Sequence, residues 1–330
     1  MSHANNRLGW VAALVIVSCL PFSRLALGQE TGAYPVRSVR MIVPFVPGGG
    51  PDTIARALGQ RLAEDLGQPF IVDNRPGAGG LLGADLLVKS PADGYVVCVC
   101  DSGQWAVQPA LQKNMPYNAA RDFQPVTMLA RVAIYLVVRS SLNASNLTGF
   151  IALVKANPGK FNYGTPGVGS IHHLMMEVFK SRAGLQLEHI PYKGAGEVVP
   201  ALLSGQVAIS FQGMPAIAAH VKQGNLNLLA VALAKRSPLA NEVPTFAESG
   251  VEGMDFPGSF AMLAPAATPM PVVTKLAGAV HAALKHPSIV ERFRVFNLEA
   301  TPSSPEAAAV QMRDDLEKFE RAAQLAGLKR

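Results

Sequence analysis

Residues 41–52 read MIVPFVPGGGPD, an apolar run that breaks into glycines just before an amphipathic segment. Behind it, apolar side chains recur every four residues at Ile54, Leu58, Leu62 and Leu66. This spacing predicts a buried strand, a glycine turn and then the N-terminus of a helix. Backbone N–H groups at such a turn point outward and the helix start carries partial positive charge, so the turn suits an anion. A tight connection that binds no ligand accounts for these residues equally well.

The order of strand, glycine turn and helix recurs immediately afterwards. A second predicted strand, 70–72, leads into the glycine turn 74–80 and a helix over 81–89, and a third strand covers 95–100. Strands that alternate with helices indicate a parallel βαβαβ sheet. The carboxyl ends of parallel strands meet at one edge of the sheet, so we expect both glycine turns and residues 101–103 to converge there.

A third glycine turn, at 164–170, follows a short predicted strand and precedes another helix. The repeated pattern indicates a second α/β lobe that faces the first. Residues 260–264 are expected to form a strand that returns between the lobes. We therefore expect lobe 1 to comprise residues 29–133 and about 255–330, and lobe 2 to comprise about 134–254.

The composition favours a folded α/β protein over a disordered chain. Of the 330 residues, 49% are hydrophobic and only 16% are charged, and 30 glycines and 25 prolines provide turns. The formal charge is +6 and no run of Lys or Arg occurs. This mild charge argues against nucleic acid as a partner.

The N-terminus has the pattern of a secretory signal peptide. Arg7 precedes an apolar run over 8–20, and Ala26 and Gly28 place small residues before a cleavage site at Gln29. The run is shorter than the roughly 20 residues that a membrane-spanning helix needs. We therefore expect residues 1–28 to be removed on secretion. The alternative is a lipid anchor, because the residues before Cys19 resemble a bacterial lipobox.

Cys98 and Cys100 are the two cysteines that lie beyond this leader. They alternate along a predicted strand, so both side chains point to one face and are expected in the core. A disulfide between positions i and i+2 of a strand is geometrically poor, and two cysteines alone make no metal site. We expect neither a metal ion nor a cofactor in this protein.

Nucleotide-binding patterns fail at each glycine turn. The turn at Gly77 and Gly79 has Leu82 where the dinucleotide pattern requires a third glycine. The turn from Gly164 has phosphate-loop spacing, but Ser170 stands where that pattern requires lysine. These substitutions argue against nucleotide binding.

Ser170, His172 and His173 suggest a serine hydrolase as an alternative function. The nucleophile-elbow pattern is absent, however, because Ile171 and His172 follow Ser170. His173 and Glu177 share one helix face at i and i+4, which is half of a metal or general-base site without a third ligand. Ser170 is better explained as a helix N-cap whose hydroxyl can also hydrogen-bond a carboxylate.

Several motifs resemble, in order along the chain, the Bug family of solute-binding proteins that serve tripartite tricarboxylate transporters. The motifs are GGGPDTIAR (48–56), NRPGAGG (74–80), DGY (93–95), PY (116–117), RDF (121–123), YGTPGVGS (163–170), PYKG (191–194), AKRSP (234–238), VPT (243–245) and ESG (248–250). They cover nearly the whole chain after the leader.

The resemblance implies a periplasmic-binding-protein type II fold, with two Rossmann-like α/β lobes and a ligand cleft between them. It implies a monomeric, non-enzymatic periplasmic protein that closes on a small carboxylate and delivers it to membrane transporter subunits. A periplasmic ligand sensor that serves a signalling system is an open alternative, as is the hydrolase that uses Ser170 and His173.

By position, the resemblance assigns ligand contacts to loops of both lobes. The residues are Pro47, Gly48, Gly49, Gly50, Asp52, Gly79, Ser102, Thr165, Gly169, Ser170, His173 and Gln212. We expect Asp52 to cap its helix and hold the loop rather than contact the ligand charge, because an acidic side chain repels an anion. Gln212 stands where the family commonly has an aspartate, which favours a neutral-tailed or dicarboxylic acid over an amino acid.

Overall fold

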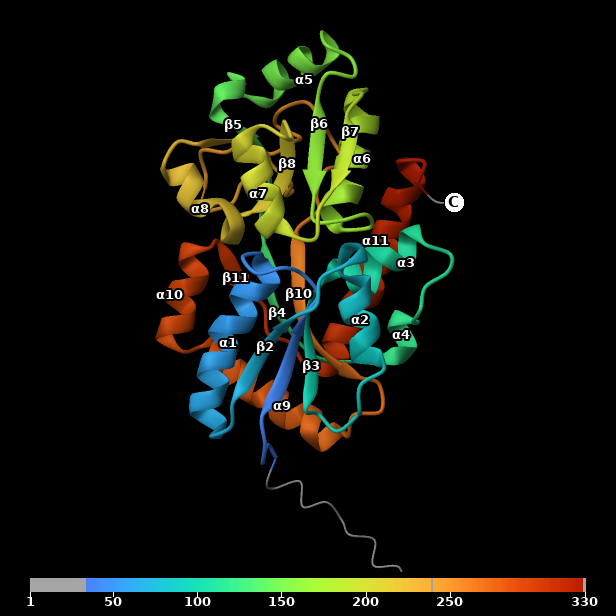
Figure 1. Cartoon of the computed structure of the whole chain (residues 1–330), viewed down its shortest axis with the longest axis vertical. Helices are drawn as coiled ribbons and strands as arrows, with labels where there is room; N and C mark the ends of the chain where they lie inside the picture. Colours follow the sequence, from blue (N-terminus) through green and yellow to red (C-terminus); the bar gives the residue numbers. More distant parts are fainter. Residues whose placement is uncertain (1–33, 239, 329–330) are drawn as a thin grey trace, which may run out of the picture. The chain divides into compact units, whose positions relative to one another are not determined.

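The computed structural model describes residues 34–238 and 240–328. They form two β-sheets, each flanked by helices, and the six-stranded sheet lies in the lower half of Figure 1. The predicted signal peptide 1–28, with the alternative lipid anchor at Cys19, lies outside the described residues. None of the described helices combines the length and the apolar character needed to cross a bilayer.

The six-stranded sheet has the order β11-β4-β10-β3-β1-β2. Its strands are β1 (Val39–Val43), β2 (Phe70–Asn74), β3 (Val96–Asp101), β4 (Phe123–Val132), β10 (Gly258–Pro265) and β11 (Leu298–Ala300). Strand β1 pairs in parallel with β2 and β3, which confirms the βαβαβ prediction. Strand β10, the strand expected to return between the lobes, lies inside this sheet and is antiparallel to β3 and β4.

The helices of this first lobe, lobe 1, come from both ends of the chain. They are α1 (Gly50–Leu66), η2 (Ala78–Gly80), α2 (Leu81–Val88), η3 (Gly103–Val107), α3 (Gln108–Leu111), α4 (Ala119–Asp122), α9 (Met270–Leu284), α10 (Pro287–Val295) and α11 (Pro305–Leu325). Ile54, Leu58 and Leu62 of α1 are fully buried, as their spacing predicts. Gly67 ends α1 in the left-handed conformation, with φ at 69°.

The five-stranded sheet, in lobe 2, has the order β7-β6-β8-β5-β9. Its strands are β5 (Ile134–Arg139), β6 (Asn162–Thr165), β7 (Glu188–Pro191), β8 (Ile209–Gly213) and β9 (Leu226–Val231). Its helices are η4 (Ser140–Leu142), α5 (Leu147–Lys155), α6 (Ile171–Ala183), α7 (Ala195–Ser204) and α8 (Met214–Lys222). Strand β6 is parallel to β7 and β8, whereas β5 is antiparallel to β8 and β9.

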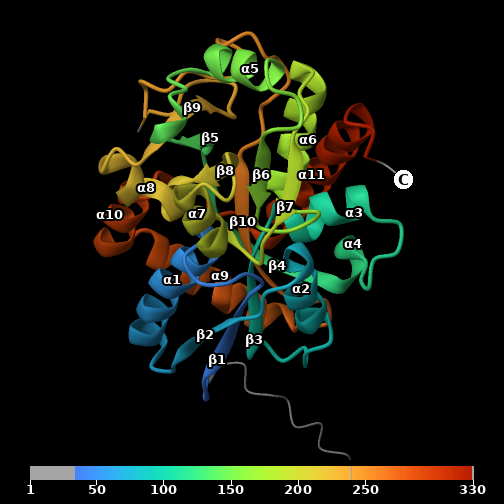
Figure 2. The ribbon, with the colours of Figure 1, turned by 45° about the horizontal axis from the view of Figure 1, so that its top comes forward.

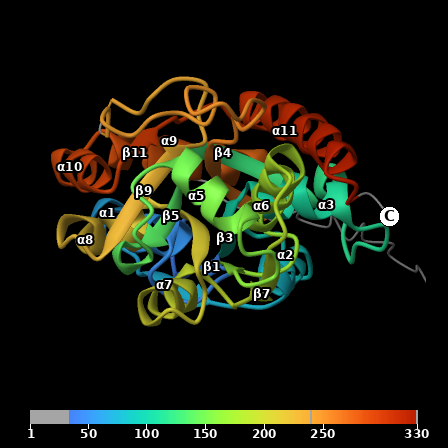
Figure 3. The ribbon, with the colours of Figure 1, turned by 90° about the horizontal axis from the view of Figure 1, so that it is seen from above.

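The chain crosses between the sheets twice within the described residues. It passes from β4 to β5 at Ala133, and it returns from β9 to β10 over residues 232–257. Figure 2 shows the loops of the two lobes facing each other across the space between the sheets. Helix α11 contacts both α3 and α6, and it runs along one side of the view in Figure 3. The C-terminal helix therefore touches both lobes.

Cys98 and Cys100 are fully buried on β3, as expected for core residues. The prediction that they stay unpaired is wrong, because the structure joins them in a disulfide. Their side chains share one face of the strand and their Cα atoms are 5.7 Å apart. That separation lies inside the range of about 4.4–6.8 Å that a disulfide spans.

Candidate functional site

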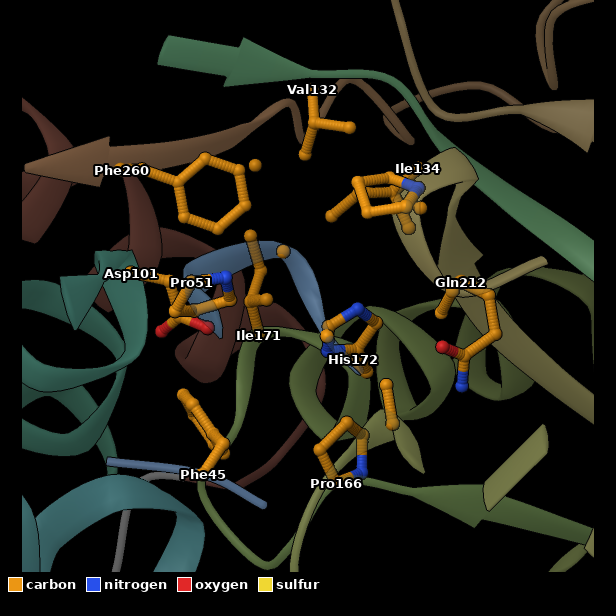
Figure 4. A pocket seen from close by; sticks show the side chains of 17 residues that line it. Phe45, Pro51, Asp101, Val132, Ile134, Pro166, Ile171, His172, Gln212 and Phe260 are labelled. Atoms are coloured by element: carbon orange, nitrogen blue, oxygen red, sulfur yellow. The ribbon is translucent and has the colours of Figure 1, made fainter. Parts of the chain in front are cut away.

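A cavity of about 50 Å³ lies between the two sheets, at the carboxyl ends of β1, β3, β6 and β8 (Figure 4). By volume it has room for a few water molecules. Its walls are mostly apolar, and the larger side chains come from both lobes: Phe45, Val132, Ile134, Pro166, Ile171 and Phe260. A ligand in this cavity would contact lobe 1 and lobe 2 at the same time.

Four helices direct their N-termini at this cavity, which is lined by the first residues of α1, α6, α7 and α8 or by the residues just before them. Helices α1, α7 and α8 follow glycine N-caps, which offer no side-chain acceptor to the first backbone N–H groups. The starts of α1 and α7 meet across the lobes, because a Cβ atom at Gly49 would lie 3.7 Å from the Cβ of Ala195. Such a convergence of N–H groups and helix dipoles stabilises an anion.

The ionisable residues that line the cavity are Asp101 and His172, so no Lys or Arg lines it within the described residues. Burial lowers the pKa of His172 to about 4, which leaves the imidazole neutral at pH 7. Burial raises the pKa of Asp101 to about 6, although hydrogen bonding to the Gly103 N–H and to Gln104 lowers it in part. Attraction for an anion therefore comes from the helix N-termini rather than from a cationic side chain.

The matching family model is the "Tripartite tricarboxylate transporter family receptor", and it covers residues 54–328. Protein BugT of Bordetella pertussis is 36% identical over 296 residues, which are 89% of this chain and 91% of that protein. The chain belongs to the tripartite tricarboxylate transporter receptor family.

Solved structures of similar sequence support the same assignment. The periplasmic binding protein BugD has a TM-score of 0.87 and 30% identity, over 90% of this chain and 99% of that chain. R. palustris Rpa4515 with adipate has a TM-score of 0.86 and 34% identity, over 89% of this chain and 98% of that chain. The fold is therefore that of the periplasmic binding proteins, as the sequence motifs imply, and members of this family are periplasmic solute-binding proteins.

Three of the ligand contacts predicted for this chain line the cavity: Gly49, Gly50 and Gln212. Gly50 has no room for a side chain, because a Cβ atom there would lie 2.6 Å from the ring of Phe260. The aromatic ring of β10 therefore packs directly on the start of α1.

Asp52 holds the loop before α1. The residue is 5% exposed, and its carboxylate accepts hydrogen bonds from Gly48 N at 3.1 Å, Arg56 Nε at 3.0 Å and Asn74 Nδ2 at 3.0 Å. Burial raises the pKa of Asp52, but these donors outweigh it and hold the pKa below its usual value. The contacts agree with the expectation that Asp52 holds the loop. The expectation that it caps α1 is wrong, because Asp52 lies inside the helix and the N-cap residue is Gly49.

The hydroxyl groups of Thr165 and Ser170 are engaged inside their own loop. Thr165 Oγ1 lies 2.6 Å from His189 Nε2, and Gly167 N donates to it at 3.2 Å. Ser170 Oγ donates to Gly167 O at 2.8 Å and accepts from His173 N at 3.2 Å, so it caps α6 as expected. Neither residue lines the cavity, and their contact with ligand stays a prediction.

Two glycines permit close contact between the lobes, Gly79 in a loop of lobe 1 and Gly196 in the first turn of α7. A Cβ atom at Gly79, where φ is 65°, would overlap Val168 O of lobe 2, and one at Gly196 would overlap Pro47 O of lobe 1. Gln108 Nε2 of lobe 1 also donates to Val168 O at 3.2 Å. The glycine loops therefore pack backbone on backbone across the cleft.

The other predicted residues do not line the cavity. Ser102 follows Asp101 and is 1% exposed, and its hydroxyl has no hydrogen-bond partner among the described residues. His173 lies with Gly169 beside a separate surface depression. Its ring stacks on that of His189 with centroids 4.3 Å apart, and its Nδ1 accepts from Gly169 N at 3.3 Å.

Sequence reasoning missed most of the cavity wall. The sequence predicted a ligand contact at His173. The two neighbours diverge at the start of α6, and it is His172 that faces the cavity. Asp101 was expected at this edge of the sheet but not as a contact residue. The sequence does not predict Phe45 and Phe260 as cavity residues, because an apolar residue that lines a cavity has the same sequence pattern as one in the core.

Proposed function

We propose that this chain is an extracytoplasmic solute-binding protein that captures a small organic carboxylate between its lobes and delivers it to a tripartite tricarboxylate-type transporter. The observation that carries the proposal is the convergence of four helix N-termini on a cavity whose described lining includes no Lys or Arg. The adipate in Rpa4515, which is 34% identical to this chain, supports a carboxylate ligand.

Capture rests on the first N–H groups of α1 and α7. A carboxylate in the cavity beside the starts of α1 and α7 exchanges its water for N–H donors of both lobes, and the two helix dipoles stabilise its charge. Because the donors come from opposite lobes, the ligand binds most tightly when the lobes meet. The apolar walls then exclude water, which strengthens the remaining electrostatic contacts.

The proposal includes export and lobe boundaries. Residues 1–28 direct secretion to the periplasm, and the mature monomer begins at Gln29. Residues 29–133 with about 255–330 form lobe 1, and about 134–254 form lobe 2. The crossings at Ala133 and 232–257 support these boundaries. Transporter subunits recognise the closed form.

Binding without chemistry fits the loop geometry better than hydrolysis does. Ser170 Oγ donates to a backbone carbonyl, and the nitrogen of His173 that contacts this hydroxyl is its backbone N–H rather than its ring. A nucleophile needs the imidazole as its base. Incubation with activated esters provides the check: ester turnover that is abolished by Ser170→Ala would contradict the binding function.

The direct test is ligand binding by the mature chain, residues 29–330. Thermal shift followed by calorimetry, against mono-, di- and tricarboxylates, aromatic acids, amines and sugars, should give stabilisation by carboxylates only. Stabilisation by amines or sugars with no response to any carboxylate would refute the proposal. Deletion of the gene that encodes this chain should abolish uptake of the bound acid. Normal uptake with a lost transcriptional response to the acid would favour a sensor.

A further inference from the structure

Gln212 places an unused hydrogen-bond acceptor at the cavity. It lies on β8, its side chain is fully buried, and it lines the lobe 2 side of the cavity (Figure 4). Its Nε2 donates to Ser210 Oγ at 2.9 Å, whereas Oε1 has no hydrogen-bond partner among the described residues. A buried polar atom without a partner is uncommon and points to a missing group.

The contacts of Ser210 decide which end of the Gln212 amide faces the cavity. Ser210 Oγ lies 2.8 Å from Gly164 O and 3.1 Å from Phe211 O, and both are acceptors. A hydroxyl has a single proton, which one of these carbonyls takes, so toward Gln212 the hydroxyl can only accept. The amide NH₂ must therefore face Ser210, and Oε1 is left as the acceptor for a ligand.

The described side chains that line the cavity supply no Lys or Arg to pair with a second anion beside Gln212. Asp101 brings a carboxyl group of its own, and His172 is a neutral imidazole whose Nδ1 has no hydrogen-bond partner among the described residues. A second carboxylate would lose its water and face acceptor oxygens without a cation. A neutral donor would complete the Oε1 hydrogen bond without that cost.

We propose that the cavity selects a carboxylic acid whose apolar body ends in a neutral hydrogen-bond donor, a hydroxyl or an amide N–H, which Gln212 Oε1 accepts. This inference rests on the proposed function, because it assumes that the carboxylate of the ligand binds at the helix N-termini. It distinguishes this chain from Rpa4515, whose structure contains adipate, an acid with carboxylates at both ends.

The experiment compares matched acids on the mature wild-type chain by calorimetry. The aliphatic set is hexanoate, 6-hydroxyhexanoate, adipate and 6-aminohexanoate; the aromatic set is benzoate, 4-hydroxybenzoate and benzene-1,4-dicarboxylate. In the set that fits the cavity, the hydroxy acid should bind at least about 10-fold more tightly than the plain acid, the dicarboxylate and the amino acid.

The Gln212→Met variant keeps the length of the side chain and removes the acceptor. We expect it to lose the preference for the hydroxy acid over the plain acid. Gln223→Met is the matched control, because Gln223 is an exposed residue at the end of α8 in the same lobe. This control should retain the wild-type ranking.

The outcomes separate the inference from the proposed function. Equal or tighter wild-type binding of the plain acid, the dicarboxylate or the amino acid overturns the inference and leaves carboxylate capture standing. A hydroxy-acid preference that persists in Gln212→Met also overturns it. Failure of the wild-type chain to bind any acid counts against the proposed function itself. If Gln212→Met does not fold, the wild-type ranking alone decides.

Discussion

At the scale of single residues, Asp101 is the side chain whose charge state most affects the cavity. The residue is 7% exposed, and its Oδ1 accepts a hydrogen bond from Gly103 N at 2.8 Å. It faces the space in which the helix N-termini favour a ligand carboxylate. Ionised Asp101 would oppose such a ligand, whereas protonated Asp101 would not.

We expect carboxylate affinity to fall as the pH rises from 5.5 to 8. Burial raises the pKa of Asp101 to about 6, so the side chain ionises inside this window and then repels the ligand. Asp101→Asn keeps an oxygen for Gly103 N and should remove most of the pH dependence, with binding about 3- to 10-fold tighter at pH 8. Calorimetry across the pH range measures both effects.

Asp314→Asn is the control for this prediction, because Asp314 is an exposed aspartate on α11. It should leave the affinity and its pH dependence as in the wild type. An Asp101→Asn variant whose ligand affinity depends on pH as in the wild type would show that Asp101 does not repel the ligand.

At the scale of elements, the loop between β6 and α6 depends on two neutral histidines. His189 Nε2 lies 2.6 Å from Thr165 Oγ1, and His173 Nδ1 accepts from Gly169 N. Burial lowers the pKa of His189 to about 4, with the neighbouring His173 as the next cause, and burial also lowers the pKa of His173. Glu177 and Lys180 are the charged groups of α6 that act on both rings.

We expect acid to destabilise this protein through these rings. A histidine with a lowered folded-state pKa is neutral in the folded chain, so its contribution to stability is complete above about pH 6.5 and is lost as the pH falls toward 4. His189→Gln should reduce the loss in unfolding free energy between pH 7 and pH 5 by about 1 kcal/mol. Urea denaturation at both pH values measures it.

His220→Gln, on α8 in the same lobe, is the matched control and should lose as much stability at pH 5 as the wild type. If His189→Gln loses as much as this control, the acid sensitivity arises elsewhere in the chain.

The contact between the start of α7 and lobe 1 can also be tested by a substitution. A Cβ atom at Gly196 would overlap Pro47 O of lobe 1, although Gly196 is an ordinary helical position within lobe 2. Overpacking costs about 1–3 kcal/mol, so Gly196→Ala should weaken ligand binding about 10-fold or more and leave the melting temperature of each lobe nearly unchanged. Calorimetry with parallel thermal melts measures both quantities.

Gly278→Ala supplies the control, because Gly278 is also helical and a Cβ atom there would meet nothing within 4 Å. It should bind ligand normally and gain up to about 1 kcal/mol from helix propensity. Wild-type affinity in Gly196→Ala would mean that contact between Pro47 and α7 is not required for binding.

At the scale of the whole molecule, the two crossings at Ala133 and 232–257 join lobes that meet through loop backbones and through the contact of α11 with α6. Hinge motion about a few crossing residues is the usual way in which such lobes separate. We expect the radius of gyration of the mature chain, measured by small-angle X-ray scattering, to decrease when ligand is added. The radius of gyration of the Gly196→Ala variant should decrease less than that of the wild type at saturating ligand. An unchanged radius in the wild type would contradict closure on the ligand.

The sequence by itself determined the local units of this fold. The spacing of Ile54, Leu58 and Leu62 predicted α1 correctly, because the apolar face of a helix is set by neighbours in the chain. The parallel pairing of β1 with β2 and β3 followed for a similar reason, since each βαβ connection spans a short stretch. A family motif then located Gly49 and Gly50, and a departure from the family pattern located Gln212; all three line the cavity.

Only the tertiary structure decided which residues meet at the cavity and why. Strand β10 arrives from distant sequence and brings Phe260 against Gly50, a contact that no local pattern encodes. The sequence predicted that the glycine turns supply anion-binding N–H groups, yet Gly79 of such a turn lets the two lobes touch where a Cβ atom would overlap the opposite backbone, as does Gly196 in α7. A periodicity reports which face of an element is apolar, whereas the partner of that face depends on how separate parts of the chain pack in space.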